Sequence, residues 1–288
     1  MKLADIEGND REAQPGLTGK CRRCGHAVVA KCGQHRVWHW AHRKSKDCDP
    51  WWERETEWHR VWKNNFPPEC QEFIQHDGQS GEKHIADVRT PHGLVIEFQH
   101  SPLDSRERAA RERFYGNMVW VVDGTRLQRD YPRFYRRKDD FYRNMVWVVD
   151  GTRLQRDYPR FDKRMDDFRP TIQGYFLLTF PDECFPAMWL DSSVPVIFDF
   201  RDLDESQLLD PFRDTLWCLL PGRVEGSAVV GAISREEFVR VALSCPQLLP
   251  VQEILEFFRE LRAADAREAR PFAGIPGGRG PRRRYARF

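Results

Sequence analysis

Cysteine and histidine residues with the spacing of metal ligands lie close together in the first fifty residues. Two residues separate Cys21 from Cys24, and His39, His42 and Cys48 follow. Zinc prefers four thiolate or imidazole ligands in a tetrahedron, and two ligands spaced in this way on a tight turn supply half of the shell. A small Cys-rich segment gains folding free energy from such a site. We therefore expect a zinc-binding module here.

Five side chains compete for the four positions around this metal. If residues 37–41 form a strand, His39 and His42 point to opposite faces, because successive side chains of a strand alternate. We predict the ligands Cys21, Cys24, His42 and Cys48, with His39 as the alternative. Four protein ligands close the shell, which is typical of a structural zinc and not of a catalytic one.

Two acidic residues flank a short hairpin loop further along the chain. The loop at residues 91–93 ends in Gly93, which accepts the left-handed conformation of a three-residue hairpin. This register places Asp87 opposite Glu97, with Gln99 on the same face. Opposed carboxylates about 5 Å apart repel each other unless a cation lies between them. Oxygen ligands of this kind suit Mg²⁺ or Mn²⁺.

A tryptophan-rich segment at 50–65 predicts a helix that contributes a third acid. Glu55 falls within its aromatic face, and His59 lies one turn further along. The tryptophans of that face are Trp51, Trp58 and Trp62. An acid on an apolar face needs a partner. The simpler alternatives are that Glu55 and His59 pair with each other, and that the two hairpin acids lie on an exposed face.

The elements that must position these residues follow the helix in a definite order. Three strands are expected, at Glu69–His76, His84–Arg89 and Leu94–His100. Ser101 and Pro102 then begin a helix that runs to about Tyr115. The apolar run 117–123 is typical of a strand buried on both faces in a parallel pairing.

The sequence then repeats itself. Residues 114–134 and 141–161 are identical except at Gly116, where the second copy has Arg143. Both copies cannot occupy the same place in a sheet. We expect the first copy to enter it, because that copy keeps the helix before it.

The rest of the chain gives fewer indications of function. Residues 1–19 are polar and are expected to be a loose lead-in. Residues 170–270 read as short strands followed by two helices, which begin near Ser234 and Val251. The arginine-rich tail 271–288 is expected to be disordered, either adding non-specific phosphate contacts or only aiding solubility.

Composition limits the possible classes of protein. Lys plus Arg number 46 and Asp plus Glu 44, so the net charge of +2 excludes a histone-like protein. No apolar run is long enough for a membrane helix, and the first residues lack the apolar stretch of a signal peptide. A cytoplasmic location without membrane attachment is expected, with the eight cysteines reduced. The sequence does not specify an oligomeric state.

The ordered motifs resemble those of the CoiA-like competence proteins. They are Cys-x2-Cys, His-Trp-Ala-His, Glu53-x-Glu55-x3-His59, Ile-Ala-Asp-Val, Ile-Glu-Phe-Gln-x-Ser-Pro-Leu and Val-Trp-Val-Val-Asp-Gly, between Cys21 and Gly124. That family is assigned to the PD-(D/E)XK nuclease superfamily, whose core is a helix, three antiparallel strands, a helix and a fourth strand. The element order expected above agrees with this core.

The resemblance implies roles for individual residues. Asp87 and Glu97 would bind Mg²⁺ or Mn²⁺, and Glu55 would be the acid from the first helix. Gln99 stands where the superfamily usually has its catalytic lysine, and a carboxamide cannot carry a positive charge. Lys83 or His59 could compensate for it.

We therefore predict an α+β chain with a zinc module and a nuclease-like core. The predicted divisions are 1–49 (zinc-binding module), 50–169 (αβββαβ core containing the duplicated strand), 170–270 (C-terminal α/β extension) and 271–288 (basic tail). The predicted catalytic set is Glu55, His59, Asp87, Glu97 and Gln99. Four arginines of the second helix could contact phosphates, or could form a plain solvated face: Arg106, Arg108, Arg111 and Arg113.

Three functions compete. The first is a metal-dependent deoxyribonuclease that hydrolyses phosphodiester bonds of DNA, with recombination or DNA-uptake proteins as partners. The second is an inactive DNA-binding accessory protein that keeps the fold, with Gln99 marking lost chemistry. The third is a zinc-centred nuclease of the His-Asn-His type. It ranks last, because a Trp-rich helix follows the Cys/His segment where that motif requires a ββα unit.

Overall fold

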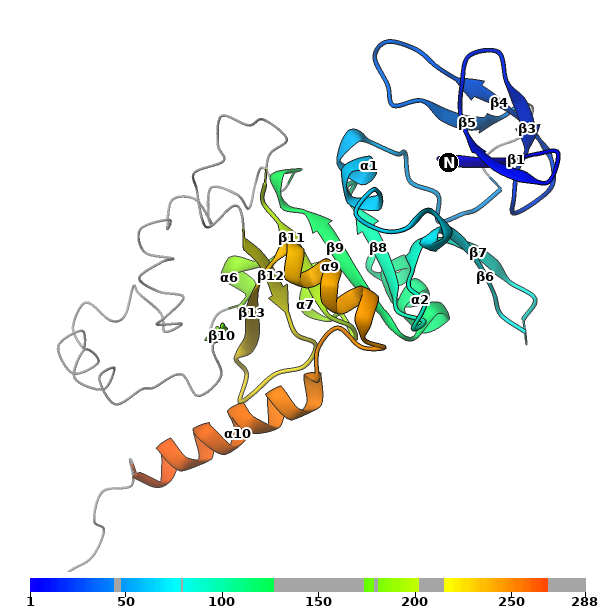
Figure 1. Ribbon diagram of the computed structural model, residues 1–288. Helices are drawn as coiled ribbons and strands as arrows, with labels where there is room; N and C mark the ends of the chain where they lie inside the picture. The colour runs from blue at the N-terminus through cyan, green and yellow to red at the C-terminus, as the bar shows by residue number, and fades with distance from the viewer. Residues whose placement is uncertain (44–47, 79, 127–173, 179–180, 202–214, 269–288) are drawn as a thin grey trace, which may run out of the picture.

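The computed structural model describes residues 1–43, 48–78, 80–126, 174–178, 181–201 and 215–268, and its strands form two sheets (Figure 1). The second copy of the repeat (141–161) and the tail 271–288 lie outside the described residues. Within the described parts, no helix combines the length and the apolar character needed to cross a membrane.

The N-terminal residues form a five-stranded antiparallel sheet in the order β2-β1-β3-β4-β5. Its strands are β1 (Leu3–Ile6), β2 (Asn9–Glu12), β3 (Thr18–Lys20), β4 (Ala27–Lys31) and β5 (His39–His42). The expectation of a loose lead-in over 1–19 is wrong, because this segment supplies three of the strands. Ala4, Val28 and Trp40 form its small core together with the sulfur of Cys21.

The second sheet has eight strands in the order β10-β13-β12-β11-β9-β8-β7-β6. Its strands are β6 (Gln71–His76), β7 (Lys83–Arg89), β8 (Val95–Gln99), β9 (Met118–Asp123), β10 (Tyr175–Leu178), β11 (Val196–Asp199), β12 (Thr215–Leu219) and β13 (Ala228–Ser234). β8, β9 and β11 are parallel at the centre, and the other pairs are antiparallel. Strands from the 50–169 and 170–270 segments therefore share one sheet.

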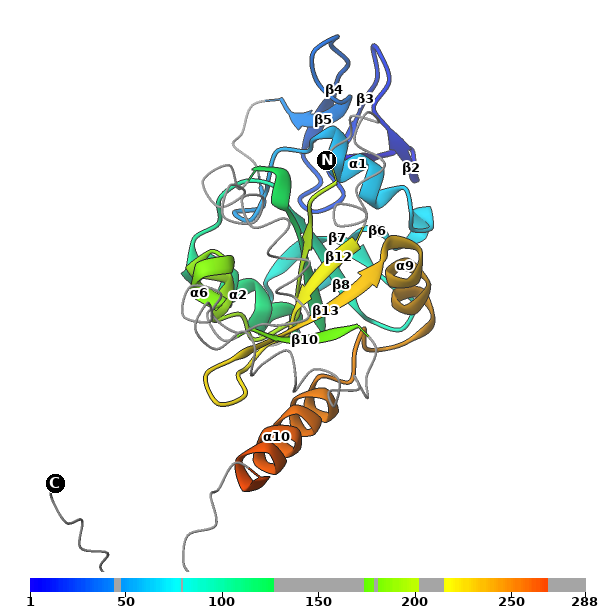
Figure 2. The ribbon, with the colours of Figure 1, turned by 90° about the vertical axis from the view of Figure 1, so that its left-hand side faces the viewer.

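Helices cover both faces of this sheet (Figure 2). The helices are α1 (Glu57–Lys63), α2 (Ser105–Tyr115), α6 (Pro181–Cys184), α7 (Ala187–Leu190), α9 (Arg235–Ser244) and α10 (Val251–Glu268), with 3₁₀ turns at Pro68–Cys70 and Gly124–Arg126. Residues of α1, α9 and α10 pack on one face, and those of α2 and α7 on the other. Alternate residues of β9, such as Trp120 and Val121, supply the two cores, as expected for a strand buried on both sides.

The order helix, three antiparallel strands, helix and parallel strand is present as α1-β6-β7-β8-α2-β9. The first copy of the repeat supplies β9, between β8 and β11. The predicted start of the second helix is displaced, because Asp104 and not Ser101 caps α2 by accepting the N–H of Arg106.

The predicted helix over 50–65 is wrong in its first half. α1 begins only at Glu57, where Thr56 and His59 form a reciprocal capping box. Trp51 lies outside the helix, because its ring stacks on His84 of β7 with a centroid distance of 3.3 Å. Glu55 therefore precedes the helix and is not part of its aromatic face.

The two remaining tryptophans of α1 tie the helix to the C-terminal part of the chain. The indole N–H groups of Trp58 and Trp62 both donate to Oδ2 of Asp199, at 3.1 and 2.8 Å. Asp199 ends β11 and also pairs with Arg235 of α9. This buried carboxylate fixes α1 against the sheet.

Candidate functional site

The four predicted zinc ligands come together where β3 and β5 of the N-terminal sheet end. The ligand atoms of Cys21, Cys24, His42 and Cys48 all lie within 4.8 Å of one another. The Sγ atoms of Cys21 and Cys48 are 3.6 Å apart, and Cys24 Sγ is 3.3 Å from His42 Nε2. A tetrahedral zinc with Zn–S bonds of ~2.3 Å requires sulfur–sulfur distances of ~3.8 Å. The group could therefore hold a metal such as zinc.

Local backbone structure places these ligands. The N–H of Gly25 donates to the carbonyl of Cys21, and the N–H of Cys21 donates to the carbonyl of His26, each at 2.8 Å. This tight turn directs both thiols inward, with Gly25 at a φ of 74°. His39 is not part of the group, because its ring nitrogen Nδ1 lies 2.8 Å from the carbonyl of Val37.

The thiols have perturbed acidities. Burial and the nearby Cys21 raise the pKa of Cys48 to about 12. Burial opposes ionisation of Cys24 too, but hydrogen bonds from the His26 backbone and the His42 ring lower its pKa to about 6. Such a set of packed thiols needs a cation to become fully ionised. With four protein ligands the shell is closed, which disfavours the zinc-centred nuclease.

The hairpin between β7 and β8 has the predicted register. Val88 is paired with Ile96, which sets Asp87 opposite Glu97, and Gly93 has a φ of 84°. Beyond this pair the backbone hydrogen bonds between β7 and β8 stop, and the carboxylates of Asp87 and Glu97 accept backbone N–H groups instead. The N–H of Phe98 donates to Asp87 Oδ2 at 3.0 Å, and the N–H of Asp87 donates to Glu97 Oε1 at 3.2 Å. Each acid is therefore locked to the opposite strand.

A cation from each neighbouring helix contacts this acid pair. Nζ of Lys63, on α1, lies 2.8 Å from Asp87 Oδ1. Nη1 of Arg111, on α2, lies 3.2 Å from Glu97 Oε2. The side chain of Glu97 is 6% exposed and that of Asp87 is 22% exposed, so solvent reaches the pair from the Asp87 side.

Burial and neighbouring charges shift the pKa values of two groups at the site. Burial and the charge of Asp87 raise the pKa of Glu97 to about 8, although Arg111 and Lys63 oppose the shift. Burial alone would lower the pKa of Lys63. The carboxylates of Asp87, Glu55 and Glu72 overcome that effect and raise it well above its usual value. A buried acid with a raised pKa thus faces a second carboxylate, and perturbed pKa values of this kind are common at functional sites.

A cavity of about 60 Å³ lies over these groups. Four of the five predicted catalytic residues line it: Glu55, His59, Asp87 and Glu97. The lining also includes Trp52, Lys63, Glu72 and Arg111. Gln99 lies outside this lining. Its Nε2 donates to the carbonyl of Ser101 at 2.9 Å, and among the described residues its buried Oε1 has no hydrogen-bond partner.

Glu55 and His59 do not pair with each other. Glu55 Oε1 is 2.8 Å from Arg60 Nε and 3.5 Å from Lys63 Nζ, and only 5% of the Glu55 side chain is exposed. His59 Nδ1 accepts the N–H of Thr56, so Nε2 can carry the proton and donate to the carbonyl of Phe98 at 3.1 Å. His59 therefore fastens α1 to β8 where the ladder stops.

Lys63 and Glu53 contact the site but are not among the residues predicted from the sequence. Lys63 lies four residues after His59, a spacing that places both on one helix face and could have indicated it. Glu53 accepts the backbone N–H groups of His100 and Ser101 at 3.3 and 2.5 Å, and nothing local in the sequence indicates this contact. The exposed Lys83, expected as a possible substitute for the missing lysine, begins β7 away from the cavity lining.

Neither alternative given for the arginines of α2, phosphate contacts or a solvated face, fits two of the four, because these two are buried. Arg108 is buried against Glu112 at 2.6 Å, and Arg111 is buried against Glu97 and Glu107. Arg106 and Arg113 are exposed. Two of the four arginines of the helix therefore form buried ion pairs within the protein.

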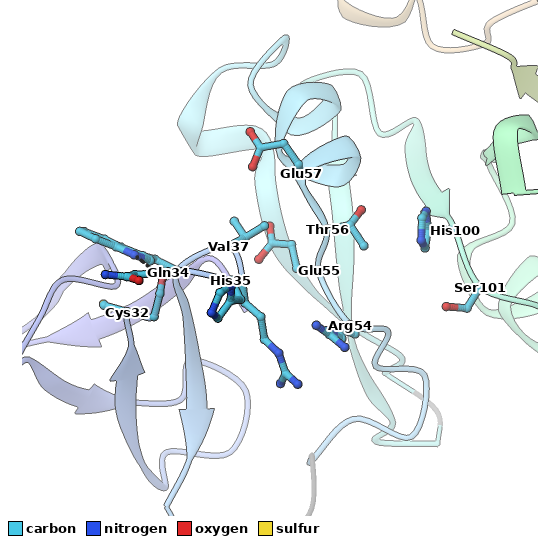
Figure 3. Close-up of a pocket in the computed structure, with 13 residues that line it drawn as sticks. Cys32, Gln34, His35, Val37, Arg54, Glu55, Thr56, Glu57, His100 and Ser101 are labelled. Atoms are coloured by element: carbon cyan, nitrogen blue, oxygen red, sulfur yellow. Dashed lines mark hydrogen bonds between the residues drawn. The ribbon is translucent and has the colours of Figure 1, made fainter. Parts of the chain in front are cut away.

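A larger groove lies beside the cavity and has a volume of about 1000 Å³ (Figure 3). One wall is the loop between β4 and β5, at 32–38, and the other is formed by 54–57 and by His100 and Ser101. Glu55 lines both the groove and the cavity.

Comparison with known proteins adds no assignment: no family model, no curated protein and no solved structure matches the chain. The site is therefore interpreted from its own geometry. Among the described residues, the zinc-type quartet is the one group of three or more His, Cys, Asp or Glu side chains within reach of a single metal.

Proposed function

We propose that the protein is a Mg²⁺- or Mn²⁺-dependent DNA nuclease with a PD-(D/E)XK-type core. The observation that carries the proposal is the Asp87–Glu97 pair, held opposite each other where β7 and β8 diverge and contacted by Lys63 in a small cavity. The element order from α1 to β9 supports it, as does the resemblance of the motifs to CoiA-like competence proteins.

The donor set fits a magnesium-type ion. Mg²⁺ commonly binds through one or two carboxylates while keeping water and substrate phosphate in its remaining positions. Asp87 and Glu97 would hold the ion, and their mutual repulsion favours a cation between them. When bound, such an ion polarises the phosphate and lowers the pKa of an attacking water.

The remaining side chains have roles that follow from their contacts. Lys63 supplies the positive charge that Gln99 cannot carry, and its contacts with Asp87 and Glu55 place this charge in the cavity. Glu55 orients Lys63 and Arg60 rather than completing a metal shell directly. Arg111 holds Glu97 in position from the opposite side.

The zinc module would act structurally. Cys48 immediately precedes Asp49, whose carboxylate accepts the N–H of Ile85 at 3.0 Å and lies 2.8 Å from His84 Nδ1. The segment that leaves the module is thereby fixed to β7, two residues before Asp87. Zinc binding would stabilise this connection.

An inactive DNA-binding protein is the second candidate, and Gln99 favours it. The carboxamide of Gln99 is buried outside the cavity lining and donates to Ser101, so it cannot act on a substrate there. In this alternative the fold is kept and Lys63 has only a structural role. A cytoplasmic location and a part in DNA uptake or recombination belong to both candidates.

Cleavage of labelled single- and double-stranded DNA with Mg²⁺, Mn²⁺ or Ca²⁺ tests the proposal. We expect cutting with Mg²⁺ or Mn²⁺ that Asp87→Asn and Glu97→Gln abolish, while Glu236→Gln, an exposed acid of α9, leaves it unchanged. DNA binding without cutting under every condition would favour the inactive protein.

A further inference from the structure

The groove between the β4–β5 loop and the segment 54–57 has the size of a polymer site rather than a metal site. Its volume of about 1000 Å³ is much larger than the 60 Å³ cavity beside it. Its two walls come from the N-terminal sheet and from the segment before α1 (Figure 3). Glu55 lines both spaces, so the groove and the cavity that holds the Asp87–Glu97 pair share a wall.

Exposed aromatic surface gathers around this groove and cavity. Among the described residues, the large hydrophobic side chains that are exposed are Trp38, Trp52 and Val61. Trp38 lines the groove and is 46% exposed, and Trp52 lines the cavity and is 41% exposed. Both lie on segments that other contacts hold in place: the carbonyl of Trp38 accepts Arg60 Nη2 at 2.6 Å, and the N–H of Trp52 donates to the carbonyl of Asp49 at 3.2 Å.

Positive charge lies along the same walls. Arg36 comes from the loop and Arg54 from the opposite wall, and within the described parts of the chain neither has an ion pair or hydrogen bond. The acids here are Glu55, which Arg60 and Lys63 neutralise, and Glu57. Guanidinium groups attract phosphates, and exposed indole faces stack on bases.

We propose that this groove binds single-stranded DNA, with bases stacked on Trp38 and phosphates facing Arg36 and Arg54. The proposal rests on the proposed nuclease function and names its substrate form. Base faces are free to stack only when the strand is unpaired, whereas a duplex presents mainly phosphates to such a groove. Specific contact with the indole therefore selects the single strand.

Binding is measured by fluorescence anisotropy of a labelled dT oligomer and of a duplex of the same length, without added divalent ion, so that cutting does not interfere. Wild type binds the single strand at least tenfold more tightly. Trp38→Ala weakens this binding about tenfold or more, and Trp38→Phe, which keeps a stacking face, restores most of it. The double variant Arg36→Ala/Arg54→Ala reduces the salt dependence of binding.

Arg259→Ala is the matched control, because Arg259 is a surface arginine of α10 that pairs only with Glu256 among the described residues. Equal affinity for duplex and single strand, or full binding by Trp38→Ala, overturns the inference. If either result is obtained and wild type still cuts DNA, the proposed nuclease function stands and only the single-strand groove is refuted. Tight Trp38-dependent binding without any cutting supports the groove and refutes the nuclease.

Discussion

The ammonium nitrogen of Lys63 lies 2.8 Å from Oδ1 of Asp87, and the same nitrogen is 3.5 Å from a carboxylate oxygen of both Glu55 and Glu72. One buried lysine thus neutralises three acids that come from three different segments. This contact ties α1 to the hairpin that carries the acid pair. Both the stability and the proposed chemistry of the site depend on it.

Replacement of Lys63 by Met leaves three clustered carboxylates without their common partner. We expect Lys63→Met to lower the free energy of unfolding by about 3–5 kcal/mol, measured by urea denaturation. Adding Glu72→Gln should recover part of the loss, with a coupling energy of about 0.5–3 kcal/mol. The exposed Lys83→Met is the control and should change stability by less than about 0.5 kcal/mol. Additive effects of the two buried substitutions would contradict this account.

The zinc site can be tested with two histidines of the same strand. His42→Asn should lose bound zinc, because His42 Nε2 lies with the thiols, whereas His39→Asn should keep it. Likewise, Cys24→Ser should lose zinc and Cys32→Ser should keep it, because Cys32 is not part of the ligand group. Metal content of the purified proteins gives the answer, and affinity should fall about 100-fold or more in the first member of each pair. Equal zinc in both histidine variants would show that the assigned ligands are wrong.

Glu72 should give the protein a defined acid sensitivity. Burial would raise its pKa, but Lys63, the N-terminal ammonium and two backbone N–H groups hold the pKa at about 2, against an ordinary 4.5. Because the folded-state pKa is the lower one, the stabilisation is complete above pH 4.5 and is lost as the pH falls toward 2. It amounts to about 3 kcal/mol.

Glu72→Gln should therefore be less stable at pH 7 and should lose less stability than wild type between pH 4.5 and pH 2. Denaturation curves at several pH values measure this. Parallel pH profiles for the two proteins would contradict the assigned role of Glu72.

Asp199 should be a stability determinant far from the acid pair. Asp199→Ala removes the acceptor of two indole N–H groups and an ion-pair partner of Arg235, so we expect a loss of about 3–5 kcal/mol. Asp199→Asn keeps an acceptor and should lose less. Glu237→Ala, which breaks an exposed pair with Arg240, should cost less than about 1 kcal/mol in the same urea titration. A loss for Asp199→Ala no larger than that would argue against the anchor.

The features predicted correctly from the sequence are set by local chemistry. The register that brings Asp87 opposite Glu97 follows from a three-residue loop ending in Gly93, and the alternation of a strand separates His39 from His42. The parallel strand was evident because an uninterrupted apolar run must be buried on both faces.

The features missed depend on contacts between distant segments. Trp51 leaves the predicted helix because it stacks on His84, and no local pattern specifies that partner. The backbone donor His100 lies 47 residues after Glu53, and the two indole donors to Asp199 lie 137 and 141 residues from it. Thr56 is a favourable N-cap residue and could have indicated the start of α1, whereas the part of His59 in the capping box is evident only from the structure.

The most direct test of the central claim compares single-turnover DNA cleavage by wild type and Asp87→Asn at saturating protein, with DNA binding measured in parallel. The account predicts Mg²⁺- or Mn²⁺-dependent cutting by wild type. It also predicts a rate at least ~10²–10³-fold lower for Asp87→Asn, with binding unchanged, because a metal-binding carboxylate contributes several kcal/mol to the transition state. Equal cleavage rates for the two proteins would contradict the assignment of the site.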